Sequence, residues 1–200
     1  MHERTRWQDE RDEAGSREYL RRFDDLAAGG ADLDGEARMV DALLARDSTV
    51  LDAGCGSGRV GAELARRGHR VCAVDLDPTL IEAARARGGL TVYEADLVEF
   101  TAPEAPFDAI VMAGNVMVYL APGTEAQVVD RLAAQLRDQG VLVAGFATDR
   151  PYTVEEFDRD LAVAGLVTES RFATWDLRPW YADAPWAVTV ARKAHPKSVR

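Results

Sequence analysis

A glycine cluster in the first half of the sequence has the composition of a ligand-binding turn. Gly54-Cys55-Gly56-Ser57-Gly58-Arg59 directly follows the apolar segment Val50-Leu51-Asp52-Ala53. Glycine lets the backbone turn sharply and approach a ligand without a Cβ clash. A helix that begins behind such a turn presents unpaired backbone N–H groups to a negatively charged group. We therefore expect a nucleotide-like ligand here, beyond the carboxyl ends of the strands.

Three acidic residues occupy successive strand ends in this region. Asp52 lies inside the segment before the glycines and suits a ligand with a cationic amine. Asp75 ends the next apolar segment, 17 residues after Gly58, where a carboxylate can accept hydrogen bonds from both ribose hydroxyls. Asp96 follows the third, where it can accept a hydrogen bond from an adenine amino group. Each acid alone is compatible with a solvated turn, but together with the glycine turn they favour a nucleoside that carries an amine.

A dinucleotide is the competing ligand. Gly56-x-Gly58-x-x-Gly61 formally matches the dinucleotide-binding fingerprint. Asp52 would place a negative charge beside a pyrophosphate, however, and no Tyr-x-x-x-Lys pair follows any of the five tyrosines. A chain of 200 residues also lacks a second domain that could hold a hydride acceptor. The dinucleotide interpretation stays the weaker alternative.

The elements that must position these residues alternate between strands and helices. The hydrophobic pattern predicts strands at 49–53, 70–74, 91–94, 107–113 and 141–147, and helices at 16–28, 35–46, 59–67, 77–87, 124–138 and 153–164. Thr124-x-x-Gln127 and Thr153-x-x-Glu156 have the capping-box spacing. Two last strands, at about 166–177 and 186–193, have no helix between them and predict an antiparallel hairpin. This pattern indicates an α/β fold, a doubly wound and mostly parallel sheet with helices on both faces.

Composition and charge narrow the functional classes. Twenty-four basic and 34 acidic residues give a net charge of −10, which disfavours a large nucleic-acid surface. No apolar run is long enough to span a bilayer, and the charged N-terminus has no secretory h-region. The two cysteines and three histidines show no metal-ligand or disulfide spacing. We expect a cytoplasmic protein that binds no metal. Its oligomeric state, monomer or homodimer, stays open.

The chain resembles the class I S-adenosylmethionine-dependent methyltransferases, including small actinobacterial members. The resemblance rests on Val50–Gly58, on Ala73-Val74-Asp75-Leu76, on Glu94-Ala95-Asp96-Leu97 and on Phe107–Val111. It implies a Rossmann-like seven-stranded sheet of order 3-2-1-4-5-7-6 with strand 7 antiparallel. It also implies methyl transfer from S-adenosylmethionine by in-line displacement, with S-adenosylhomocysteine as the product. A noncatalytic protein that binds either compound is the alternative from another class.

The resemblance also implies which residues contact the cofactor. The glycines would approach its methionine part, Asp52 its amino group, Asp75 its ribose and Leu76 its adenine. The full set is Asp52, Gly54, Cys55, Gly56, Gly58, Arg59, Asp75, Leu76, Ala95, Asp96, Leu97, Gly114, Asn115 and Val116.

The acceptor side is less specific, and we assign it no catalytic residue. Strand polarity directs the loops at 115–123, 148–152 and 178–185 toward the acceptor. The candidate contacts are Tyr19, Tyr119, Asp149, Tyr152, Trp180 and Tyr181, although each aromatic ring could merely pack at a loop edge. Asn115-Val-Met-Val differs from the Asn/Asp-Pro-Pro-aromatic tetrad of nucleobase amino-methylating enzymes, so a small-molecule acceptor is favoured over nucleic acid. His69 falls at the opposite end of the sheet and is rejected as a base.

The sequence of the N-terminal segment predicts a helix that packs over the cofactor cleft. The apolar face of the helix at 16–28, with Tyr19 and Phe23, needs a surface to bury against, and the cofactor cleft offers one. The charged stretch 1–15 is expected to be disordered without ligand. We expect 1–35 to act as a helical lid on a methyltransferase domain at 36–194, followed by a frayed tail at 195–200. A permanently docked helix is the alternative.

Overall fold

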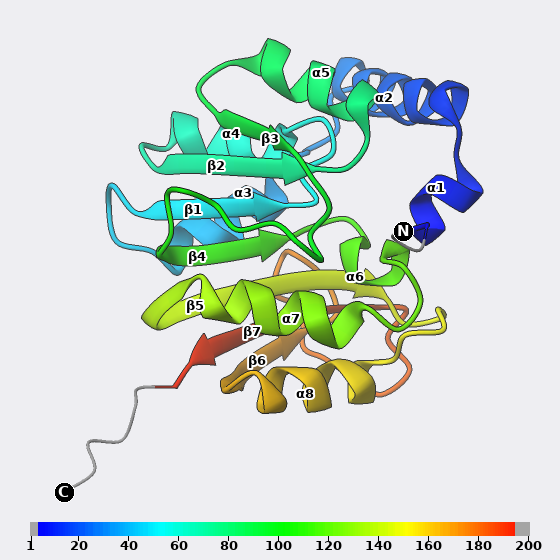
Figure 1. Cartoon of the computed structure of the whole chain (residues 1–200). Helices are drawn as coiled ribbons and strands as arrows, with labels where there is room; N and C mark the ends of the chain where they lie inside the picture. Colours follow the sequence, from blue (N-terminus) through cyan, green and yellow to red (C-terminus); the bar gives the residue numbers. More distant parts are fainter. Residues whose placement is uncertain (1–3, 195–200) are drawn as a thin grey trace, which may run out of the picture.

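A seven-stranded sheet runs through the molecule in the order β3-β2-β1-β4-β5-β7-β6 (Figure 1). The computed structural model describes residues 4–194. The pairs formed by β7 with β5 and β6 are antiparallel, and the other pairs are parallel. The predicted strand order and the antiparallel strand 7 are confirmed. The strands are β1 (Thr49–Ala53), β2 (Arg70–Asp75), β3 (Thr91–Glu94), β4 (Phe107–Met112), β5 (Leu136–Ala147), β6 (Leu166–Phe172) and β7 (Trp186–Lys193).

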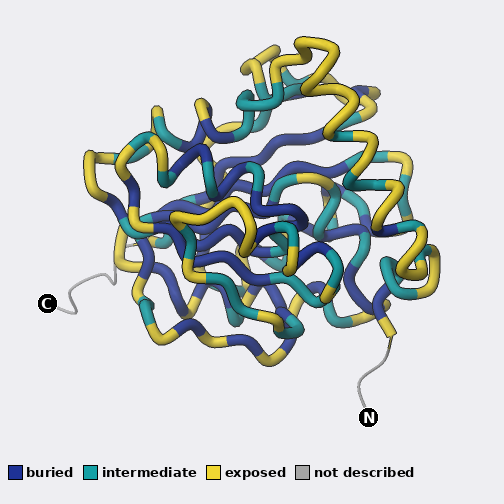
Figure 2. The backbone as a smooth tube through the Cα atoms, turned by 90° about the horizontal axis from the view of Figure 1, so that it is seen from above, coloured by how far each residue is buried: buried dark blue, intermediate teal, exposed yellow. Residues whose placement is uncertain are grey.

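Helices cover both faces of the sheet, as predicted. Two of them, α3 and α4, bury apolar side chains against one face, and α7 and α8 do so against the other. The segment between β3 and β4 covers the second face with Leu97 and Phe100 instead of a helix. Figure 2 shows the central strands as the buried part of the molecule. The helices are α1 (Arg6–Glu10), α2 (Glu13–Ala28), α3 (Gly35–Ala42), α4 (Arg59–Arg66), α5 (Pro78–Arg87), α6 (Val116–Tyr119), α7 (Glu125–Ala134) and α8 (Val154–Val163).

Tertiary pairing overrides local helix propensity at the end of α7. The helix predicted to reach 138 ends at Ala134, because Leu136 pairs with Phe107 and begins β5. The Gln135 side chain accepts a hydrogen bond from Ala102 N at 2.8 Å and fixes this change of direction. The predicted capping box at the start of α7 is also wrong, since the Thr124 hydroxyl donates to the Ala121 carbonyl. The predicted box at Thr153 is confirmed.

The N-terminal segment contains helical structure within the described residues 4–15, where the polar sequence led us to expect none. Thr5 and Gln8 form a capping box that begins α1, and the Asp12 side chain accepts a hydrogen bond from Gly15 N at the start of α2. These caps supply backbone partners that the polar composition of the segment does not predict. Residues 1–3 and the predicted frayed tail at 195–200 lie outside the described part of the chain.

The sheet brings the predicted ligand-binding residues to one edge. The carboxyl ends of the parallel strands β1, β2 and β4 meet there, and α2 packs beside α5 above that edge (Figure 1). The shorter α1 lies next to α6, which follows β4. The two N-terminal helices therefore lie across the strand ends where a nucleotide-like ligand is expected.

Candidate functional site

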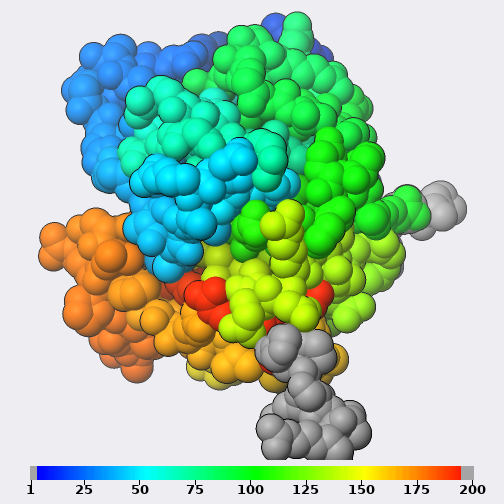
Figure 3. Space-filling model, turned by 90° about the vertical axis from the view of Figure 1, so that its left-hand side faces the viewer, coloured from blue at the N-terminus to red at the C-terminus, as the bar shows by residue number. Residues whose placement is uncertain are grey.

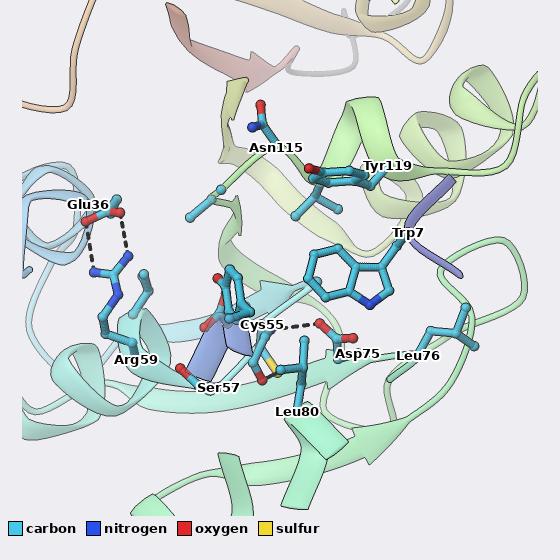
Figure 4. A pocket seen from close by; sticks show the side chains of 18 of the residues that line it. Trp7, Glu36, Cys55, Ser57, Arg59, Asp75, Leu76, Leu80, Asn115 and Tyr119 are labelled. Atoms are coloured by element: carbon cyan, nitrogen blue, oxygen red, sulfur yellow. Dashed lines mark hydrogen bonds and ion pairs between the residues drawn. The ribbon is translucent and has the colours of Figure 1, made fainter. Parts of the chain in front are cut away.

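A cavity of about 500 Å³ opens between the strand ends and the N-terminal helices (Figure 4). Its size is that of ordinary small-molecule sites. We call the turn at 52–58 together with Asp75 the floor, and α1 and α2 the roof. The cavity is lined by all but one of the residues predicted to contact the cofactor: Asp52, Gly54, Cys55, Gly56, Arg59, Asp75, Leu76, Ala95, Asp96, Leu97, Gly114, Asn115 and Val116.

The glycines of the floor are required by backbone conformation and by close approach. Gly54, Gly56 and Gly58 have φ values of +72°, +53° and +71°. A Cβ on Gly54 would lie 2.6 Å from Val116 Cγ2, so the turn after β4 fits only against a glycine. Gly58 is the predicted contact that lies outside the cavity wall. A Cβ there would lie 2.9 Å from Ala84 Cβ, so Gly58 permits α4 to pack against α5.

Asp52 is a buried acid whose charge depends on what enters the cavity. Its side chain lies at the cavity wall, is 1% exposed and accepts a hydrogen bond from Gly61 N at 2.8 Å. Desolvation raises the pKa of Asp52 to about 7, although Arg59 and the Gly61 hydrogen bond oppose the shift. A cationic group placed beside Asp52 would favour the ionised carboxylate.

Asp75 joins the floor to the end of β2. Its Oδ2 accepts a hydrogen bond from Gly56 N at 2.7 Å (Figure 4). Its Oδ1 accepts one from Asp77 N at 3.0 Å. Burial raises the pKa of Asp75. Each carboxylate oxygen has a second lone pair that can accept from a ligand hydroxyl. The Asp96 carboxylate lines the cavity further on, where its Oδ1 accepts a hydrogen bond from Val98 N.

Arg59 ties the start of α4 to α3. Its guanidinium pairs with both oxygens of Glu36, at 2.6 and 3.0 Å, on the side of the cavity opposite Trp7 (Figure 4). It also lies 5.3 Å from the Phe23 ring centroid and donates to the Leu33 carbonyl. Through these contacts Arg59 links the start of α4 to α2, to the segment before α3 and to α3 itself. No local pattern in the sequence indicates Glu36, since an ion pair between residues 23 positions apart depends on the tertiary fold.

The roof presents aromatic rings to the cavity. The Trp7 ring meets those of Tyr19 and Tyr119 edge-on, with centroids 5.5 and 5.3 Å apart. The Tyr19 hydroxyl lies 3.5 Å from where a Cβ on Gly56 would stand, directly over the glycine turn. Burial raises the pKa of Tyr19. Tyr19 and Tyr119 thus lie at the cavity, as expected of acceptor-side candidates, whereas Trp7 was not predicted.

Polar contacts hold the roof in place. Asp77 Oδ2 accepts hydrogen bonds from Trp7 Nε1, at 2.9 Å, and from the Ser16 hydroxyl. Next to Trp7, at the start of α1, Arg6 donates to Glu125 Oε1 at 2.8 Å and to the Leu120 carbonyl at 2.9 Å. The roof therefore rests on the start of α5 and on the segment between α6 and α7.

The other four acceptor candidates do not line this cavity. Asp149 is not among the residues that line it, and Tyr152 is buried with its hydroxyl on Asp160 at 2.6 Å. Trp180 stacks on Arg171, 5.7 Å away, and Tyr181 is 55% exposed.

The connection between β6 and β7 explains two of these positions. Phe172 pairs with Pro179, and Ala173 N bonds the Arg178 carbonyl, so residues 173–178 form a closed turn. This turn brings Trp175 to the cavity, which Trp186 from the start of β7 also lines. Their positions depend on the bridge and on strand register, for which the sequence has no local signal.

Several residues away from the cavity bear on the sequence-based expectations. His69 Nε2 lies 3.0 Å from Asp41 Oδ1 and does not line the cavity, in keeping with its rejection as a base. Within residues 4–194, no three His, Cys, Asp or Glu side chains gather in a way that could hold a metal ion. Over the same residues, each helix is too short or too polar to cross a membrane.

Comparisons with known proteins converge on one family. A methyltransferase-domain family model matches residues 50–140. Among solved structures, a TehB-like S-adenosylmethionine-dependent methyltransferase from Corynebacterium glutamicum is 37% identical, with a TM-score of 0.87; the match covers 91% of this chain and 100% of that one. A methyltransferase from Mycobacterium bovis is 32% identical over 137 residues, or 66% of this chain and 58% of that protein.

Other curated relatives match over shorter stretches. The ubiquinone biosynthesis O-methyltransferase of Xylella fastidiosa is 48% identical over 67 residues, which is 30% of this chain and 27% of that protein. A magnesium-protoporphyrin O-methyltransferase from Rhodobacter capsulatus is 38% identical over 79 residues, or 36% of this chain and 34% of that one. The chain thus spans about a third of the length of these two relatives.

Proposed function

The chain belongs to the class I S-adenosylmethionine-dependent methyltransferases, and on this premise we propose that it transfers a methyl group to a small-molecule acceptor in the cavity. The observation that carries the proposal is the floor, where Asp52, Gly56 and Asp75 border the same cavity. The cofactor of this family supplies a methyl group already activated by the positive charge on its sulfur.

The residues of the floor fit that cofactor. Gly56 has no heavy atom closer than 3.5 Å to the point where a Cβ would stand, so the methionine part could lie against the backbone there, while Gly54 accommodates Val116. Asp52 would orient the cationic amino group, and Asp75 would accept from the ribose hydroxyls on its remaining lone pairs. Leu76 would contact the adenine, and Ala95, Asp96 and Leu97 would line its pocket.

The roof would complete the site by excluding water. Trp7 packs against Tyr19 and Tyr119 in T-shaped pairs above the glycine turn, and the three rings would limit the directions from which an acceptor can approach. We propose that the segment 1–35 opens and closes as a lid over the domain at 36–194. A cavity of about 500 Å³ and a net charge of −10 support a small molecule rather than nucleic acid as the acceptor.

Ligand binding tests this proposal before any acceptor is known. S-adenosylmethionine and S-adenosylhomocysteine should bind with micromolar affinity in calorimetry, and NAD should not. At a ligand concentration about 100 times the Kd, linkage predicts roughly 2.7 kcal/mol of stabilisation and a higher melting temperature. NAD binding without S-adenosyl binding would refute the proposal. Transfer of a labelled methyl group then separates an enzyme from a noncatalytic binder.

A further inference from the structure

Two tryptophans line the end of the cavity beside β5 and β7. In the antiparallel ladder between these strands, Trp186 lies directly opposite Ala147. Directly opposed residues place their side chains on the same face of a sheet. Trp186 therefore lies on the face covered by α3 and α4, and it packs against that apolar cluster.

Trp175 lies on the same face of β5. A Cβ on Gly145 would stand 2.4 Å from Trp175 Cζ2, so the indole rests on the strand where a side chain is missing. Gly145 is two residues before Ala147 and shares its face. Figure 3 shows the segment near 175, in orange, beside the blue N-terminal part of the chain, and a Cβ on Gly35 would lie 3.8 Å from Trp175 Cβ. Two planar indole side chains thus form one wall of the cavity.

The polar atoms at this wall are hydrogen-bond donors. Trp186 Nε1 is buried and has no hydrogen-bond partner among the described residues. Asn115 Oδ1 accepts a hydrogen bond from Ala147 N at 2.7 Å, which leaves the amide Nδ2 as a donor. Asn115 adopts φ +73°, a conformation uncommon outside glycine, at the cavity wall. Both residues are neighbours of Ala147, because Trp186 is its ladder partner and the Asn115 side chain accepts a hydrogen bond from its N–H.

The acids at the cavity are already engaged. Each of the five carboxylates that line it has a hydrogen-bond partner: Asp32 with Arg38, Glu36 with Arg59, Asp52 with Gly61 N, Asp75 with Gly56 N, and Asp96 with Val98 N. The described lining includes no histidine. With the cofactor bound as proposed, Asp52 and Asp75 would face its amino group and its ribose. Asp32 and Glu36 are paired with arginines, so we assign none of these four acids to deprotonate an acceptor.

Resting on the proposed methyl transfer, we propose that the acceptor is a planar aromatic molecule whose reacting oxygen is already ionised at neutral pH, an aromatic carboxylate or an acidic phenol. Its ring would lie against Trp175 and Trp186. Its oxygen atoms would receive hydrogen bonds from Trp186 Nε1 and Asn115 Nδ2. The acceptor oxygen supplies the electron pair of the new O–CH₃ bond, the sulfur keeps the pair of the broken S–CH₃ bond, and no proton moves.

The test uses the full chain saturated with S-adenosylhomocysteine and two probes that share one ring system. 2-Naphthoate carries an ionised oxygen acid, and 2-naphthylmethylamine carries a cation on the same ring. The chain has four tryptophans, so an indole ¹H–¹⁵N spectrum has four signals, and Trp186→Phe identifies the one from Trp186. We expect 2-naphthoate to move that signal downfield and to bind at least about tenfold more tightly than the amine.

Variants separate hydrogen bonding from packing. Trp186→Phe should weaken 2-naphthoate about tenfold or more, while Trp180→Phe, outside the cavity, should not. Asn115→Asp keeps the acceptor for Ala147 N but replaces the donor with a negative oxygen, so it should weaken 2-naphthoate at least as strongly and favour the amine. Equal binding of the two probes, or unchanged 2-naphthoate binding in either cavity variant, would overturn the acceptor assignment.

The failure of this assignment and that of the proposed function are distinguishable. S-Adenosylhomocysteine binding is measured first by calorimetry, without any acceptor probe. Absence of that binding refutes the proposed function. Binding of S-adenosylhomocysteine with no preference for 2-naphthoate and no shift of the Trp186 signal refutes the acceptor assignment alone.

Discussion

The floor and the roof of the cavity are held by different kinds of interaction. The floor is fixed by backbone: Gly54 meets Val116 closely, and Asp75 accepts from two main-chain N–H groups. The roof is fixed by side chains, chiefly the contacts of Trp7 and Ser16 with Asp77. A surface held by backbone geometry tolerates little change, whereas one held by a few side chains can detach. The contrast suits a rigid cofactor site beneath a movable cover.

The largest effect should come from filling the space at Gly54. Gly54→Ala adds a Cβ 2.6 Å from Val116 in a residue with φ +72°. The left-handed conformation costs alanine about 1–2 kcal/mol, and overpacking adds about 1–3 kcal/mol. We expect the free energy of unfolding to fall by roughly 2–5 kcal/mol in urea denaturation, with cofactor binding lost.

Gly123→Ala is the matched control for this substitution. Gly123 has φ +81°, does not line the cavity, and has no heavy atom within 4 Å of the point where a Cβ would stand. The free energy of unfolding of Gly123→Ala should therefore fall only by the cost of the left-handed conformation, about 1–2 kcal/mol. Equal losses in the two variants would show that close packing does not fix the floor.

The next effect concerns the ribose contact. Asp75→Ala removes the proposed acceptor of the ribose hydroxyls and also the partner of Gly56 N. Losing one charged hydrogen-bond partner costs about 1.5–3 kcal/mol, or roughly 10- to 150-fold in affinity. Calorimetry with S-adenosylhomocysteine measures the loss, and circular dichroism checks the fold. An unchanged Kd in a folded variant would refute the assignment.

A smaller effect should come from pH. With the pKa of Asp52 raised to about 7, the carboxyl is mostly protonated at about pH 5.5 and about half ionised at pH 7. The ionised form attracts a cationic amine, so S-adenosylhomocysteine should bind about tenfold more tightly at about pH 7 than at about pH 5.5. Asp52→Asn should remove most of this dependence. Asp75 and Glu36, whose charges also act on Asp52, are unchanged in that variant. Any pH dependence of affinity that remains in Asp52→Asn would therefore come from other groups such as these two.

The same group affects folding with the opposite sign. Because the folded pKa lies above the ordinary value of 3.8, the folded state binds more protons between about pH 4 and 7. The contribution of Asp52 to the free energy of unfolding therefore decreases as pH rises through that range. The free energies of unfolding of the ligand-free protein and of Asp52→Asn, measured by urea denaturation, should therefore depend differently on pH between about pH 4 and 7. The expected change in S-adenosylhomocysteine affinity falls within the same pH range.

The floor could be predicted from sequence, whereas the wall formed by Trp175 and Trp186 could not. The glycine turn, Asp52 and Asp75 are encoded within short segments, and strand polarity alone brings them to one edge. Trp175 reaches the cavity only through the Phe172–Pro179 bridge, and Trp186 only through its register with Ala147. Contacts of that kind join distant residues and leave no periodic signal in the chain. The same reason explains why α7 ends at Ala134.

The smallest effect should separate a movable roof from a fixed one. Ser16 is 1% exposed, and its hydroxyl donates to Asp77, so Ser16→Ala removes one hydrogen bond to a carboxylate. The docking of α2 should weaken by about 1.5 kcal/mol, which is about tenfold in the population of the open state. An isolated helix of 16 residues is marginal in water, so an undocked α2 would lose amide protection. Glu18→Ala, at an exposed ion pair on the same helix, is the control. We expect amides at 17–27 to exchange about tenfold faster in Ser16→Ala than in either the control or the parent, and S-adenosylhomocysteine to restore their protection. Exchange at 17–27 that is equal in all three proteins, with and without ligand, would mean that the roof is permanently docked.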